Sequence, residues 1–253
     1  MNNLFFYEHP LTERMRLFLR FEFLWKQIKY HSELDQEYSH RAVISFLVEL
    51  LELLERGDIK TEVHKELDLK LTILNHVLTN PAADKKTTSG LINKVNIQKN
   101  NINEIDTSFM SALKNSELLT NIRHRNAVPG GLLSFDLPEL HNWLRFPIEM
   151  KERRLSHWLK KLEIIASSIS FILWLNREWI DLRSASAEEG VYNYQMDHQT
   201  SVNMIRIGIP SSDYYFPEIS AGRHRFIIRF CKTDEEDKPV QLTGSVNFLI
   251  GVI

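Results

Sequence analysis

The chain has 253 residues, enough for one large or two modest domains with a buried core. Hydrophobic residues make up 43% of it and charged residues 25%, which is ordinary for a globular protein. The formal net charge of −2 argues against a protein that coats nucleic acid through bulk positive charge, so any basic recognition site must be local.

The cysteine content and the start of the chain bear on its compartment. A single cysteine, Cys231, excludes an internal disulfide and fits a reducing environment. The first residues contain no basic segment and reach Glu8 at once, unlike a secretory signal peptide. The longest uncharged run within a predicted helix, residues 164–176, is too short to cross a bilayer. We therefore expect a cytoplasmic protein that does not enter the membrane.

The N-terminal part of the chain predicts a strand and then a helix. The aromatic run at residues 4–8 favours a short strand, and a helix is expected from Pro10 to about residue 30. Its apolar stripe recurs at helical spacing and consists of Leu17, Phe21, Leu24 and Ile28. Apolar residues on its other faces favour burial on more than one side, either in the core or against a second subunit.

Further helices are expected over residues 40–56, 58–79, 87–98, 106–113 and 116–125. Gly57 is predicted to end the first of these in a left-handed conformation, and Asp58 to cap the next. Arg56 lies at this corner and has two interpretations. It is either a recognition residue or a cation that satisfies the last carbonyls of its helix.

The sequence Pro129-Gly-Gly131 is the strongest break in the chain. After it, Asp136 is predicted to cap a helix that has Pro138 in its first turn. A long helix is then expected from residue 148 past residue 179, with the continuous apolar stripe that is typical of the central helix of a bundle.

From residue 184 the pattern changes to period two. Residues 184–190 are small and acidic and predict a linker. Strands are expected over residues 191–196, 202–209, 223–232 and 240–250. The acidic turn at 234–237 predicts that the last two strands form a hairpin.

These elements predict an α+β fold with two domains. A mainly helical domain, in which dimerisation is also expected, covers residues 10–184. An antiparallel β domain covers residues 190–253, and the strand at residues 3–8 is expected to join it.

The strand over residues 223–232 places three arginines on one face. Because side chains alternate along a strand, that face carries Arg223, Arg225, Ile227, Arg229 and Cys231. The other face carries the set that a strand buries, His224, Phe226, Ile228 and Phe230. No acid lies between Glu218 and Asp234 to neutralise the arginines.

Such a row suits an acidic or mixed-charge partner, because guanidinium groups are planar and always charged. The alternative is an edge strand that uses basic charge to prevent aggregation.

The sequence lacks the common enzyme signatures. No glycine-rich phosphate loop follows a strand, no Gly-x-Ser-x-Gly elbow is present, and the ten histidines form no His-x-x-x-His pair. We therefore expect no catalytic activity, no metal and no cofactor, and interpret the chain as a binding or assembly protein.

Four blocks of sequence, in order, carry a family resemblance. They are Phe6-Tyr-Glu-His-Pro-Leu11 with Leu19-Arg20-x-Glu22-Phe23-Leu24; Glu55-Arg-Gly57 with Glu66-Leu-Asp68; Pro129-Gly-Gly131 through Ser134-Phe-Asp-Leu-Pro138 to Leu140-His141-x-Trp143-Leu144; and Tyr215-x-Pro217-x-Ile219-Ser220 with Arg225-Phe-x-Ile-Arg-Phe230. Together they resemble the ZapD family of bacterial cell-division proteins, which bind FtsZ.

The resemblance implies a cytoplasmic dimer without catalytic activity or cofactor, which FtsZ recruits to the division site at mid-cell. It implies binding to the C-terminal peptide of FtsZ, bundling of FtsZ protofilaments, a lower FtsZ GTPase activity and a stabilised Z-ring. The positions that it implies for FtsZ binding are Arg20, Arg56, His141, Arg225 and Arg229, with Arg223 as a further candidate.

One basic position of the family aligns with Glu117, so that position contributes little here or Lys114 replaces it. The alternative function is a nucleic-acid-binding module that uses the same arginine-rich strand. The net charge and the inward direction expected for the strand's phenylalanines disfavour it, and we expect neither a nucleic-acid nor a membrane partner.

Overall fold

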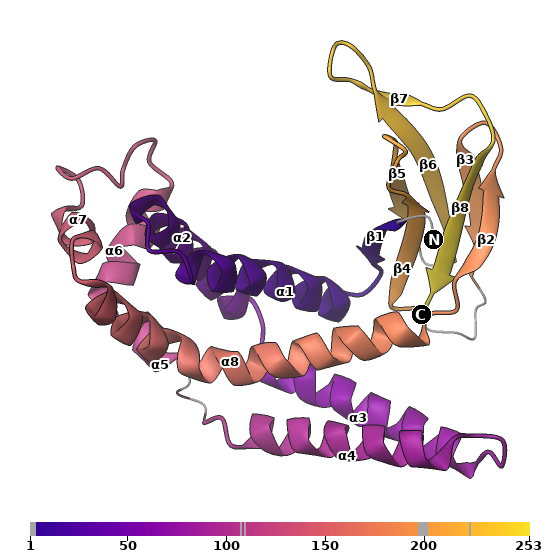
Figure 1. The fold of residues 1–253 in the computed structure, drawn as a ribbon, viewed down its shortest axis with the longest axis horizontal. Helices are drawn as coiled ribbons and strands as arrows, with labels where there is room; N and C mark the ends of the chain where they lie inside the picture. Colours follow the sequence, from indigo (N-terminus) through magenta and orange to yellow (C-terminus); the bar gives the residue numbers. More distant parts are fainter. Residues whose placement is uncertain (1–3, 107, 109, 197–201, 223) are drawn as a thin grey trace. The chain divides into compact units, whose positions relative to one another are not determined.

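The computed structural model describes residues 4–106, 108, 110–196, 202–222 and 224–253 (Figure 1). The chain divides into two compact units. One consists of Met1–Arg16 with Trp174–Ile253 and contains the strands, and the other is Leu17–Leu173 and is helical. The predicted α+β class is therefore confirmed.

The helical unit contains most of the first and last helices and all helices between them. They are α1 (Glu13–Ser32), α2 (Glu37–Glu55), α3 (Ile59–Thr79), α4 (Lys85–Asn103), α5 (Ser111–Lys114), α6 (Glu117–Asn126), α7 (Pro138–Leu144) and α8 (Ile148–Trp179). The predicted helices are present in the predicted order, except that the helix expected over residues 106–113 is reduced to the four residues of α5. The apolar stripe of α1 is buried within the chain, since Phe21 and Ile28 have no exposed surface.

Helices α3 and α4 form an antiparallel hairpin (Figure 1). Lys99 of α4 forms an ion pair with Asp68 of α3, and His64 is hydrogen-bonded to Asn103 at 2.6 Å. Helix α4 begins earlier than predicted because Asp84 caps its start, accepting hydrogen bonds from the backbone N–H groups of residues 86 and 87, and it continues past the predicted end to Asn103.

The helix ends confirm one predicted cap and correct two others. The Asp58 carboxylate accepts a hydrogen bond from the Thr61 N–H at 3.1 Å and caps α3 as predicted. Gly57 is not left-handed, because among the described glycines only Gly130 and Gly190 have positive φ.

Asp136 does not cap α7. The N-cap of that helix is Leu137, which makes no capping bond through its side chain, and Asp136 instead accepts a hydrogen bond from Arg125 at 3.2 Å.

The other unit is built from two antiparallel sheets. Its strands are β1 (Leu4–Pro10), β2 (Arg183–Ala187), β3 (Val191–Gln195), β4 (Met204–Pro210), β5 (Phe216–Ala221), β6 (Arg225–Thr233), β7 (Pro239–Gln241) and β8 (Val246–Val252). The first sheet has the order β1-β4-β8-β2, and the second has the order β3-β6-β5 with β7 also paired to β6. The predicted joining of the N-terminal strand is confirmed, because β1 pairs with β4.

Two predictions about the strands are wrong. Strand β6 forms its hairpin with the short β7, whereas β8 crosses to the first sheet and pairs with β4 and β2. The expected linker over residues 184–190 contains most of β2, whose small side chains fit beside β8.

The two sheets share one hydrophobic core. Apolar residues of β4, β6 and β8 meet there, among them Ile205, Ile207, Phe226, Ile228, Phe230 and Phe248. The end of α8 belongs to this unit, and its Arg177 donates two hydrogen bonds of 2.8 Å to Glu8 of β1.

Gly251 allows the chain after α8 to lie close to β8. A Cβ atom at this position would lie only 2.0 Å from Cγ2 of Ile180, so a larger residue could not fit unless Ile180 shifted.

Candidate interaction surface

Strand β6 is held firmly at the centre of the second sheet. Its side chains Phe226, Ile228 and Phe230 are fully buried, as predicted from the alternation. The Phe226 ring stacks on Tyr194 with a centroid distance of 4.8 Å, and Phe230 meets Phe248 of the opposite sheet at 4.7 Å. With β3 on one side and β5 on the other (Figure 1), the strand is a rigid support for the residues between these anchors.

Arg225 and Arg229 lie on the opposite face of β6, and both are exposed. Their Cα atoms are separated by about 13 Å at the usual rise of a strand. In the sheet register, Arg225 lies opposite Gln195 of β3, and Arg229 lies opposite Val191 of β3 and Glu218 of β5. The structure therefore brings these two predicted site residues together on one surface.

The two arginines differ in their partners. Arg229 donates a hydrogen bond to the Glu218 carboxylate at 3.1 Å, in a pair whose side chains are 58% and 40% exposed. The expectation that no acid neutralises the row is wrong for Arg229, because strand pairing brings Glu218 beside it. Arg225 makes no ion pair with any residue that the structure describes. Of the two arginines, Arg225 therefore has the guanidinium group that is more available to a partner.

Cys231, another member of the predicted row, does not join this surface. Cys231 is only 4% exposed and lies in register between Phe216 of β5 and Gln241 of β7. Burial, with a contribution from Glu218, raises the pKa of its thiol, so Cys231 lacks the thiolate character of a reactive cysteine. Arg223 lies outside the described residues.

Arg20 and Arg56 belong to the helical unit, and both are exposed. Arg20 lies on α1. Arg56 is the C-cap residue of α2, where its charge is favourable beside the last carbonyls, as the alternative interpretation proposed. Glu117 is exposed in the first turn of α6, where a negative charge is favourable, and Lys114 lies at the end of α5.

His141 is engaged within the helical unit. Its Nε2 lies 3.2 Å from Nη2 of Arg41, which also pairs with Glu37 at 2.9 Å. A guanidinium can only donate, so Nε2 of His141 accepts and carries no proton in this arrangement. Because Arg41 and Arg56 are separated by about 22 Å along α2, His141 and Arg56 do not form one cluster.

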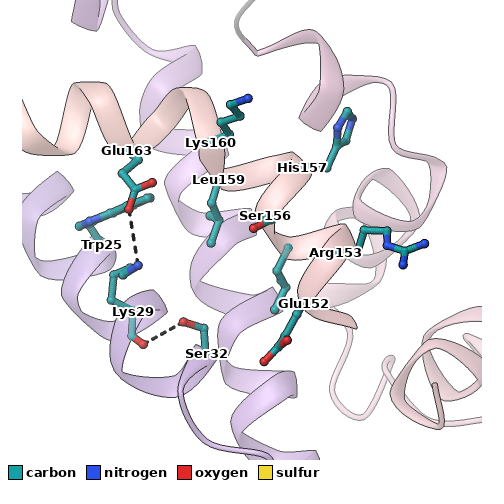
Figure 2. A pocket seen from close by; sticks show the side chains of 11 residues that line it. Trp25, Lys29, Ser32, Glu152, Arg153, Ser156, His157, Leu159, Lys160 and Glu163 are labelled. Carbon is teal, nitrogen blue, oxygen red and sulfur yellow. Dashed lines mark hydrogen bonds and ion pairs between the residues drawn. The ribbon is translucent and has the colours of Figure 1, made fainter. Parts of the chain in front are cut away.

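A cavity of about 510 Å³ lies between the end of α1 and the first half of α8 (Figure 2). Lys29 and Glu163 point toward each other across it, with an ion-pair distance of 3.6 Å. The Ser32 hydroxyl donates to the Lys29 carbonyl at 2.9 Å. Its lining carries charges of both signs, and none of the predicted site residues contributes to it.

Comparison with known proteins decides the family. The sequence model of ZapD, described as a cell division protein, matches residues 19–229. The chain belongs to the ZapD family.

Curated members of this family match the chain over nearly its full length. The cell division protein ZapD of Methylococcus capsulatus is 32% identical over 252 residues, which cover 100% of this chain and 99% of that protein. ZapD of Enterobacter sp. (strain 638) is 30% identical over 246 residues, covering 95% and 96%, and ZapD of Yersinia pestis (strain Pestoides F) is 32% identical over 240 residues, covering 92% and 92%. The family indicated by the four sequence blocks is confirmed, and with it a role in cell division.

The described residues contain no group of three or more His, Cys, Asp and Glu arranged to hold a metal ion. None of their helices has the length and apolar composition that crossing a bilayer requires.

Proposed function

We propose that the chain binds the C-terminal peptide of FtsZ, cross-links and bundles FtsZ protofilaments, and stabilises the Z-ring while lowering FtsZ GTPase activity. One observation carries the proposal. Two exposed arginines are fixed on β6 by buried aromatic neighbours, in a chain of the ZapD family.

The electrostatics of this surface favour a weak but additive interaction. Arg225 and Arg229 present planar cations that suit carboxylate groups. Each exposed ion pair contributes only about 0–1 kcal/mol, so several contacts are needed and salt weakens them. Arg20, Arg56 and His141 are proposed to supply further contacts, and Arg223 remains a candidate.

Cross-linking requires at least two sites for each particle. We infer a homodimer, in which two weak sites gain avidity and a two-fold axis directs them to different filaments. Dimerisation is proposed for the helical region, residues 10–184, and peptide binding mainly for residues 190–253 with 3–8.

Helix α1 offers a candidate dimer surface. Its stripe through Phe21 is buried inside the chain, but Phe23 and Tyr30 are 57% and 63% exposed. Sedimentation of a Phe23→Ser/Tyr30→Ser variant, compared with the wild type, tests whether this face joins two copies.

The remaining parts of the proposal follow from the same assignment. The protein acts in the cytoplasm, is recruited to mid-cell by FtsZ, and needs neither catalysis nor a cofactor. Binding of nucleic acid through β6 is disfavoured, because the aromatic side chains of this strand, Phe226 and Phe230, are buried and cannot stack on bases.

Charge reversal on β6 tests the proposed site. Arg225→Asp and Arg229→Asp are expected to keep the fold and abolish co-sedimentation with FtsZ polymers. Lys232→Asp is the matched control, because Lys232 is an exposed cation of the same strand whose position alternates to the other face. Wild-type bundling by both arginine variants would remove β6 from the site.

A further inference from the structure

Strand β3 is an edge strand without the usual protection. Edge strands expose unpaired backbone groups, and proteins commonly guard them with proline or charge. Among the described edge strands, β1 carries Glu8 and Pro10, β2 carries Arg183, and β5 carries Pro217 and Glu218. Strand β3, with the sequence Val-Tyr-Asn-Tyr-Gln, carries neither proline nor charge.

The hydrogen bonds at the two ends of β3 show which of its backbone groups are free. The Phe230 N–H donates to the Gly190 carbonyl at 2.8 Å, and the Met196 N–H donates to the His224 carbonyl at 2.9 Å. Because the bonding direction alternates along an antiparallel strand, even-numbered residues of β3 bond to β6 and odd-numbered ones face outward. The N–H and C=O groups of Asn193 and Gln195 therefore point away from the sheet, and no hydrogen bond between described residues uses them.

The side chains of β3 are uncharged, and the nearest charges on the exposed face of the neighbouring strand β6 are Arg225 and Arg229. Val191 and Gln195 lie opposite Arg229 and Arg225 in the register, and so share the exposed face with them. On the other side of β6, Glu218 stands between Arg229 and the edge of the sheet. An acidic segment along β3 would meet no carboxylate among the described side chains of that strand, Val191–Gln195.

We propose that the C-terminal peptide of FtsZ binds as an added strand along β3, through the outward backbone groups of Asn193 and Gln195. An added strand lies about 10 Å from β6, a distance that an arginine and an acidic side chain span together. Any acidic side chain on the alternate positions of the added strand that share the exposed face would then face Arg225 or Arg229. This binding mode rests on the proposed function and adds the backbone contacts that fix the peptide's direction and register.

Binding of a labelled synthetic peptide of the FtsZ C-terminus to the full chain, followed by fluorescence anisotropy, tests this mode. Peptides methylated at one backbone nitrogen at a time are expected to lose affinity at every second position, because only alternate N–H groups of a strand face its neighbour. This arm uses the wild-type protein and so does not depend on the folding of a variant.

A variant of β3 provides the second arm. Asn193→Pro removes an outward N–H but no hydrogen bond to β6, and is expected to weaken binding at least about 10-fold. Asn193→Thr, which keeps the N–H and favours a strand, is the matched control and should bind like the wild type. Circular dichroism and the melting temperature verify that both variants fold.

The outcomes separate the binding mode from the function. If the wild type fails to bind the peptide, the proposed function fails and the added strand fails with it. If the wild type binds but the loss on methylation has no period of two, the peptide binds this chain at a surface other than β3. In that case only the added strand is refuted. If Asn193→Pro changes the sedimentation of the protein alone and leaves peptide affinity intact, the edge pairs with a second copy, which also overturns this mode.

Discussion

Replacing Glu218 by glutamine should strengthen binding to FtsZ. Glu218 accepts a hydrogen bond from Arg229 at 3.1 Å and competes with any acidic partner for the same guanidinium. An exposed ion pair of this kind contributes about 0–1 kcal/mol. Releasing Arg229 from it should therefore tighten the complex by up to about fivefold. Glutamine keeps the size of the side chain, so the free energy of unfolding should fall by less than about 1 kcal/mol.

The assay is fluorescence anisotropy with the labelled FtsZ peptide at low and high ionic strength. The gain should shrink as salt rises, because the Debye length falls from about 10 Å at 0.1 M to about 3 Å at 1 M. Glu236→Gln is the matched control. It removes the same charge from the β6–β7 turn, where Glu236 pairs with Lys238, and should leave affinity unchanged. Equal affinities of Glu218→Gln and the wild type at low salt would refute the competition.

Three further predictions concern the stability of the fold. Phe230→Ala, which leaves a cavity in the core between the sheets, should lower the free energy of unfolding by about 3–5 kcal/mol in urea denaturation. Asp58→Ala removes the cap that accepts from Thr61 and should cost about 1 kcal/mol, whereas Asp58→Asn should retain most of it. Burial, assisted by the nearby Lys151 ammonium, lowers the pKa of His40 below 6.5, so stability present above pH 6.5 should be lost as the pH falls through the lowered value. A His40→Asn variant, compared by urea denaturation between pH 7 and pH 5, should lose less stability on acidification than the wild type.

The exposed and buried faces of β6 could be predicted because they depend only on local alternation. Phe226, Ile228 and Phe230 are apolar at every second position, and any sheet with one buried face would turn them inward. The helices were predictable for a similar reason, since the stripe through Phe21 recurs at helical spacing. Such periodicities need no knowledge of distant contacts.

The pairing of strands depends on residues far apart in the chain and was not predictable in the same way. Glu218 meets Arg229 only through the register of β5 with β6. The acidic turn after β6 predicted a hairpin, but it returns into the three-residue β7, and β8 reaches the other sheet. Strand β2 was interpreted as a linker because serine and alanine have little strand preference. Its pairing with β8, which local sequence does not reveal, makes it a strand.

The family resemblance indicated Arg225 and Arg229 as interaction residues, whereas charge and side-chain alternation alone did not. Charge and alternation left two interpretations of Arg225 and Arg229 open, a guarded edge strand and a recognition strand, and slightly favoured the edge strand. The structure distinguishes these residues by their partners, and it places β6 at the centre of its sheet, where no edge needs protection. The unguarded edge belongs to β3, whose role only the three-dimensional arrangement could indicate.

Co-sedimentation with FtsZ polymers tests the central claim most directly. The wild-type chain is mixed with polymers of full-length FtsZ or of FtsZ that lacks its C-terminal peptide, and the pelleted fraction and filament bundling are compared. We predict that the chain pellets with full-length FtsZ and bundles it, and that it stays in the supernatant with the truncated protein. Equal pelleting with both polymers would contradict recognition of the C-terminal peptide.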